Sequence, residues 1–194
     1  SVVSGGLFKS ETPSTIVDTT LDDIGSLSLI RASASVLHGN TLSDSRGVGL
    51  YLSDVNGATI AKTLIRRTHG AQSLRITANS RQITVADTQI VGGANSGVLI
   101  DRNARDISFS GNSILAQIAG GLRVQRAGCL LIAGNLIAGN GGLGISLERV
   151  SAGRLDGNVI AFNRSAGVSI SGQACGFNGS AQHFNLFGKM ECLI

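Results

Sequence analysis

The feature that most constrains the fold is a short motif that returns every 23–24 residues. The motif Gly-Asn-x-aliphatic begins at Gly39, Gly111, Gly134 and Gly157. Nine residues after each Asn, a Gly opens a Gly-apolar-x-apolar segment such as Gly121-Leu122-Arg123-Val124. Two degenerate copies, with Thr63 and Thr88 in the Asn position, complete a register of segments that start at 49, 73, 97, 121, 144 and 167. A fixed period of this length predicts a solenoid of about six coils over residues 31–173.

Alternation within each unit predicts strands. Apolar residues stand at every second position, as in Ile107 and Phe109 before Asn112, and few stretches keep a helical period. We expect two inward aliphatic ladders, which begin at Leu50 and Leu52 and recur in each coil. Asn112, Asn135 and Asn158 are expected to stack as a ladder of amides at a left-handed turn, with a second ladder through Asn140 and Asn163. The Gly residues are expected to supply positive φ or close approach.

Two solenoids fit the first half of the unit. The segment from Ile107 to Ile114 also fits a leucine-rich repeat, which would need a helical or extended Leu-x-x-Leu return. Here the return is Gly-Val-x-Ile or a variant of it, a second strand with its own period of two. The pattern favours an all-β parallel β-helix over leucine-rich repeats.

Composition supports a packed core and excludes several classes. Hydrophobic residues make up 42% of the 194 residues, charged residues 14% and aromatic residues 4%, with 27 Gly and one Pro. These values argue against a disordered chain and against collagen. No apolar run approaches the roughly 18 residues of a membrane span. The net charge of +4 lacks the basic runs and interleaved aromatics of a nucleic-acid-binding protein.

The three Cys show no zinc-ligand spacing, so no metal or cofactor is expected. Cys129 lies in an apolar run and is predicted to be buried. Whether Cys175 and Cys192 form a disulfide stays open.

Two terminal segments depart from the repeat. Residues 1–30 are expected to be a lead-in or partial coil, and residues 174–194, rich in Phe, a cap over the last coil or an oligomerisation segment. If residues 174–194 form a subunit interface, we expect a homo-oligomer, for example a trimer. The start Ser1-Val2-Val3-Ser4, without Met or a signal peptide, suggests a fragment of a longer protein or a mature product.

The repeat closely resembles the right-handed parallel β-helix of pectin-lyase-like proteins, which include polysaccharide lyases, polygalacturonases, mannuronan epimerases and phage tailspikes. The resemblance covers residues 31–173. It implies a polysaccharide partner, no nucleic acid or membrane partner, and a location that is extracellular, cell-surface, periplasmic or on a virion. The family's substrate groove, usually along one strand face, would here use the outward residues of the Gly-apolar-x-apolar strands.

Those outward positions give the candidate site. Tyr51 offers a ring for stacking on a sugar, Arg75 and Arg123 are planar forks for carboxylates or sulfates, and Gln125 adds a hydrogen-bonding amide. Asp101 and Glu148 lie two coils apart, about 9.6 Å by strand spacing. That separation is near the wide end of the roughly 6.5–9.5 Å found in inverting glycosidases. They are the candidate catalytic pair.

The family's catalytic motifs are missing. Asp-Pro-His is excluded because Pro13 is the one Pro, and Gly-His-Gly, Arg-Ile-Lys and Arg-x-Pro-x-x-Arg do not occur. The leading hypothesis is therefore a domain that binds, or helps to process, a polysaccharide on its strand face. The alternatives are a non-catalytic structural or oligomerisation module of a larger fibre or spike, and an isolated hydrolase, lyase or epimerase.

Overall fold

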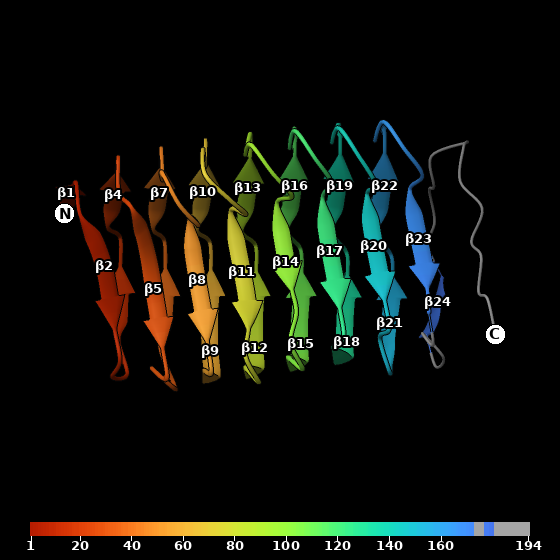
Figure 1. Ribbon diagram of the computed structural model, residues 1–194, viewed down its shortest axis with the longest axis horizontal. Helices are drawn as coiled ribbons and strands as arrows, with labels where there is room; N and C mark the ends of the chain where they lie inside the picture. Colours follow the sequence, from red (N-terminus) through yellow and green to blue (C-terminus); the bar gives the residue numbers. More distant parts are fainter. Residues whose placement is uncertain (173–176, 181–194) are drawn as a thin grey trace.

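A computed structural model describes residues 1–172 and 177–180. The chain forms three parallel sheets, A, B and C, whose strands follow one another in turn along the sequence (Figure 1). Each strand hydrogen-bonds to its equivalents in the preceding and following coils, so the coils stack into a rod. No helix occurs within the described ranges, and hence none there is long and apolar enough to cross a membrane. The predicted all-β parallel solenoid is confirmed.

Each sheet has eight strands. Sheet A comprises β1 Val2–Ser4, β4 Thr20–Asp22, β7 Thr41–Ser43, β10 Leu64–Arg66, β13 Gln89–Val91, β16 Ser113–Leu115, β19 Leu136–Ala138 and β22 Val159–Ala161. Sheet B comprises β2 Leu7–Ser10, β5 Ser26–Ile30, β8 Leu50–Ser53, β11 Leu74–Thr77, β14 Val98–Ile100, β17 Leu122–Gln125, β20 Ile145–Glu148 and β23 Val168–Ser171. Sheet C comprises β3 Thr15–Val17, β6 Val36–His38, β9 Asn56–Ala61, β12 Arg81–Ala86, β15 Arg105–Ser110, β18 Gly128–Ala133, β21 Gly153–Asp156 and β24 Phe177–Ser180.

The regular stack extends beyond the six coils expected from the motif. Residues 1–30, expected to be a lead-in or partial coil, contribute β1 to β5. Leu27 and Leu29 continue the two aliphatic ladders, aligned with Leu50 and Leu52. The Gly-Asn marker is lost there, but the inward aliphatic residues are kept. Of the predicted cap at 174–194, only β24 lies in the described residues. Cys175 and Cys192 fall outside them.

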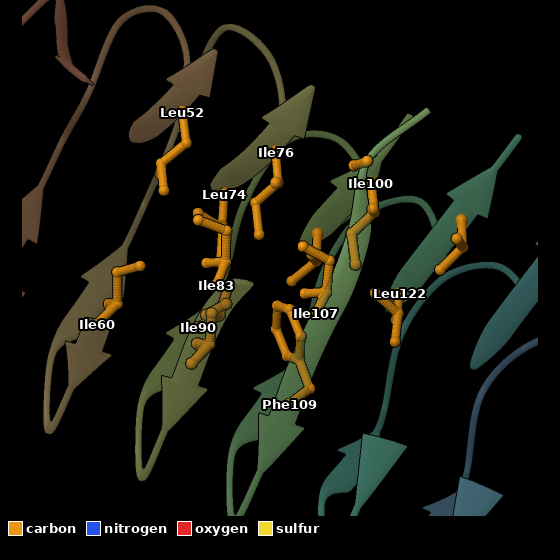
Figure 2. Packing of buried hydrophobic residues seen from close by; sticks show 14 of the residues in the cluster. Leu52, Ile60, Leu74, Ile76, Ile83, Ile90, Ile100, Ile107, Phe109 and Leu122 are labelled. Atoms are coloured by element: carbon orange, nitrogen blue, oxygen red, sulfur yellow. The ribbon is translucent and has the colours of Figure 1, made fainter. Parts of the chain in front are cut away.

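The core consists of the predicted aliphatic ladders. Figure 2 shows Ile76, Ile83 and Phe109 projecting into the space that the three sheets enclose. The side chains of the two sheet B ladders are at most 8% exposed, and Phe109 is the largest fully buried residue. Because aliphatic side chains stack in register from coil to coil, the fold closes its core almost without aromatics.

Both predicted amide ladders are present at the buried corners. The Nδ2 of Asn112 donates to the Oδ1 of Asn135 at 3.0 Å, and that of Asn135 donates to Asn158 at 2.9 Å. In the second ladder Asn140 donates to Asn163 at 2.8 Å. The left-handed residue at the first turn is the Gly before each Asn, such as Gly134 (φ 62°), and not the Asn itself. The Asn therefore contributes its amide, and the Gly contributes the backbone conformation.

The Gly residues that precede the sheet B strands of the later coils, such as Gly121 and Gly144, serve close approach rather than positive φ. A methyl group added at Gly121 would lie 2.5 Å from Cγ2 of Ile137 and 2.6 Å from the carbonyl oxygen of Gly144. Gly144 faces the same crowding from Ile160. A side chain at this corner would collide with the next coil.

The prediction that Cys129 is buried is wrong. Its thiol is exposed, because Leu130 and Ile132 take the inward positions of β18 and Cys129 adopts a left-handed conformation (φ 53°) at the start of the strand.

Candidate functional site

The outer face of sheet B carries the predicted binding residues in two columns. Strand pairing places Tyr51 beside Arg75, and Leu99 between Arg75 and Arg123. Gln125 pairs with Glu148 in the neighbouring column. Because alternate residues of a strand point to opposite faces, these side chains lie outward while the ladders beside them fill the core. The structure thus brings the predicted residues onto one surface.

Asp101 is held by Arg75. The guanidinium of Arg75 donates to Oδ2 of Asp101 at 2.9 Å, across one coil boundary. Asp101 is only 6% exposed, and its Oδ1 and the Oγ1 of buried Thr77 have no hydrogen-bond partner among the described residues. A buried carboxylate is stable only with such a cation, so Arg75 first of all stabilises Asp101.

Glu148 is held by Gln125. The amide of Gln125 donates to Oε2 of Glu148 at 2.6 Å. In register, Gln125 stands in the coil between Asp101 and Glu148. An inverting pair needs two free carboxyl groups with room for water between them. Here each carboxylate is already bonded and an amide occupies the intervening coil, so the arrangement gives little support to catalysis by this pair.

Arg123 is the free cation of the face. It is exposed, and it forms no ion pair or side-chain hydrogen bond with the described residues. Together with Ser96 and Ser146 it lines a hollow of about 280 Å³ at the edge of sheet B. A guanidinium with two hydroxyls beside it suits a carboxylate or sulfate group next to sugar hydroxyls. Tyr51, half-buried, lies in the same column three coils away.

The corner between sheets A and B is occupied by ion pairs. Asp23 binds Arg46 through two hydrogen bonds of 2.9 and 2.8 Å, and Asp44 binds Arg67 and His69. The hydrogen bond from Arg67 is the main reason that the pKa of Asp44 falls from 3.8 to about 2. These pairs tie adjacent coils together. Within the described ranges, no three His, Cys, Asp or Glu side chains are placed to hold a metal ion.

A larger hollow was not anticipated from the sequence. It lies at the corner between sheets B and C and is lined by Arg81, Arg105, Arg126 and Arg149. The four residues recur at intervals of 21 to 24, so the same period that revealed the core would have revealed them. They were missed because they are scattered singly and form no basic run.

Fold and face together define a parallel β-helix protein with a polar, partly basic outer strand face. The chain belongs to the right-handed β-helix family, whose model of a right handed beta helix region matches residues 5–114 and 101–185. No curated protein sequence matches the chain.

Among solved structures, the chain is similar to the periplasmic alginate epimerase AlgG, with a TM-score of 0.80 and 22% identity over 87% of this chain. A mutant of the same epimerase gives a TM-score of 0.79 at the same identity and coverage. The match spans 39% of the epimerase chain. At this identity the likeness concerns the fold.

Proposed function

We propose that this β-helix binds an acidic polysaccharide along the outer face of sheet B, outside the cytoplasm. The observation that carries the proposal is Arg123, an exposed guanidinium without a counter-ion that lines a hollow together with two Ser residues. Two other cations in this column, Arg75 and Lys9, are already paired with Asp101 and Glu11. Arg123 is therefore the group with charge left over for a ligand.

The rest of the face suits a sugar chain. Tyr51 presents a ring, and Gln125 and Glu148 present an amide and a carboxylate that hydrogen-bond hydroxyls. The columns run along the rod axis with about 4.8 Å between coils, so a linear polymer meets equivalent positions repeatedly. Likeness of fold to an alginate epimerase adds support, since alginate is an acidic polysaccharide. The proposal concerns binding and assigns no catalytic step to Asp101 and Glu148.

The test is isothermal titration of the chain with oligosaccharides of uronic acids and with neutral oligosaccharides of equal length. Arg123→Ala should weaken binding to the acidic oligosaccharides about tenfold, the value of one charge-assisted hydrogen bond. Arg154→Ala is the control, because it removes an exposed charge from β21, on the outer face of sheet C. Tyr51→Ala should weaken binding further, while Tyr51→Phe should retain it.

Two results would contradict the proposal. One is binding to no glycan, which would leave a structural module as the better function. The other is equal binding of acidic and neutral oligosaccharides with no effect of Arg123→Ala.

A further inference from the structure

A wide groove lies at the corner between sheets B and C. Its volume is about 690 Å³, and we call it the corner groove. Eleven residues line it: Asn79, Arg81, Asn103, Ala104, Arg105, Arg126, Ala127, Gly128, Cys129, Arg149 and Ser151. Four of them are Arg and none is acidic.

The solenoid itself gathers these charges. Arg126 and Arg149 are the first residues after β17 and β20, at the same left-handed turn of consecutive coils (φ 48° and 53°). Arg81 and Arg105 begin β12 and β15 and pair directly with each other. The backbones of adjacent coils are about 4.8 Å apart, so each pair places two Arg side chains next to each other on the surface.

The four guanidiniums have no partner of their own. All four are exposed, and none forms an ion pair or side-chain hydrogen bond within residues 1–172 and 177–180. Other Arg residues on this rod do, including Arg46, Arg67, Arg75 and Arg154. Like charges placed this closely repel one another, and an anion between them would relieve that repulsion. The arrangement is therefore that of a site whose anion comes from outside the chain.

The groove is open along the rod axis. It continues into a second hollow of about 330 Å³ that shares Asn79 and Arg81 with it and is also lined by Arg31 and Asp54. A channel that crosses several coils fits a linear polymer better than a small ion. Asn79 and Asn103 add exposed amides, which donate and accept hydrogen bonds as sugar hydroxyls require. The lining contains no aromatic residue, so nucleic-acid bases would find no ring on which to stack.

We propose that the corner groove is a second binding site, which takes an acidic polysaccharide lying along the solenoid axis with its carboxylates or sulfates on Arg81, Arg105, Arg126 and Arg149. Arg is suited to this because its planar fork binds such groups in bidentate fashion. The site goes beyond the sheet B proposal, since it uses another face and other residues.

Cys129 gives a readout specific to the groove. It is an exposed free thiol in the lining, so its alkylation by neutral iodoacetamide reports on occupancy. Peptide mass spectrometry separates Cys129 from Cys175 and Cys192. We expect a polyuronate and a sulfated dextran to slow alkylation of Cys129 at least fivefold at low salt. Neutral dextran should leave the rate unchanged.

The matched variant is the double change Arg126→Ala with Arg149→Ala. Ala78 already occupies the equivalent left-handed turn position (φ 53°), so alanine is accepted by this turn. The variant should need at least tenfold more polyuronate for half-protection of Cys129. Lysine at both positions should restore part of the protection, whereas Arg164→Ala should behave like the unaltered chain.

The proposal is overturned if neither polyanion protects Cys129, or if the double variant is protected as well as the unaltered chain. Stronger protection by an oligothymidine than by the polyuronate would overturn the assignment to a glycan. Protection by inorganic sulfate equal to that of the polymers would overturn the assignment to a polymer. Since the alkylation rate reports on the groove, its failure is distinct from failure of the sheet B proposal, which is read at Arg123.

Discussion

At the residue scale, Asn135 shows what the recurring Asn of the repeat does in the fold. Its Oδ1 accepts hydrogen bonds from the backbone N–H and the Nδ2 of Asn112, at 2.9 and 3.0 Å. Its Nδ2 donates to the carbonyl of Phe109 and to Oδ1 of Asn158. All of these groups are buried, so one side chain satisfies polar atoms in three consecutive coils.

We predict that Asn135→Ala lowers the free energy of unfolding by about 3 kcal/mol, because it leaves buried donors and acceptors unpaired. Gln89→Ala, on the exposed side of β13, should change it by less than about 0.5 kcal/mol. Chemical denaturation of both variants measures this. Equal stability of the two would refute the structural role of the amide ladder.

Asp44 makes stability depend on acid. Its pKa falls from 3.8 to about 2 because Arg67 and His69 bind the carboxylate. A lowered pKa means that the folded state holds its proton less tightly than the unfolded chain. The contribution of Asp44 is therefore fully present above pH 4 and is lost as the pH falls toward 2.

We expect the unfolding free energy of the unaltered chain to fall more steeply between pH 4 and pH 2 than that of Asp44→Asn. Asp106→Asn is the control, because Asp106 contacts no cation among the described residues. Denaturation curves across this range give the two slopes. Parallel curves for the chain and Asp44→Asn would show that the ion pair adds no stability.

At the scale of the element, the Gly before a sheet B strand, such as Gly121 before β17, allows adjacent coils to approach closely at this corner. Gly121→Ala should destabilise the chain by about 2 kcal/mol, the range for overpacking, because its methyl group would meet Ile137 and Gly144. Gly142→Ala meets nothing closer than 3.3 Å and should cost less than about 1 kcal/mol. Thermal unfolding compares them. An unchanged melting temperature for Gly121→Ala would contradict close approach as the reason for this Gly.

The elements also show how far the sequence could be interpreted. Strand register, both ladders of sheet B and both amide ladders follow from a period of 23–24 residues, since each coil repeats the same environment. Residues 1–30 were underestimated because they keep inward residues such as Leu27 without the Gly-Asn marker. Spacing also placed Arg75 and Asp101 on one face.

The repeat could not predict which side chains the site residues bind. Spacing gives the coil and the face of a side chain but not the rotamer that bonds Arg75 to Asp101, or Gln125 to Glu148. Cys129 is exposed because it adopts a left-handed conformation near the start of β18. Its apolar neighbours in the sequence give no sign of this conformation. The corner groove combines two repeat positions, one shared by Arg126 and Arg149 and the other by Arg81 and Arg105, and spacing alone does not show that both positions line one hollow.

At the scale of the whole molecule, the rod has one mildly basic strand face and one strongly basic corner. The net charge is +4, and neither Arg123 nor the four Arg residues of the corner groove form an ion pair with the described residues. Attraction between such a surface and a polyanion is screened by salt, with a Debye length near 10 Å at about 0.1 M ionic strength.

We therefore predict that raising the ionic strength from about 0.05 to about 0.5 M weakens binding of a polyuronate by more than tenfold. Titration at several salt concentrations measures the slope. Binding that is insensitive to salt would mean that the Arg residues do not contact the ligand.

The most direct measurement of the central claim is an NMR titration that follows the Nε–Hε signals of the Arg side chains as an acidic oligosaccharide is added. Binding on sheet B predicts a saturable shift of the Arg123 signal, and occupation of the corner groove predicts shifts of Arg126 and Arg149. The signals of Arg46 and Arg164 should stay in place. If Arg123 does not shift while the oligosaccharide binds, or if all Arg signals shift alike, polysaccharide binding on the strand face is contradicted.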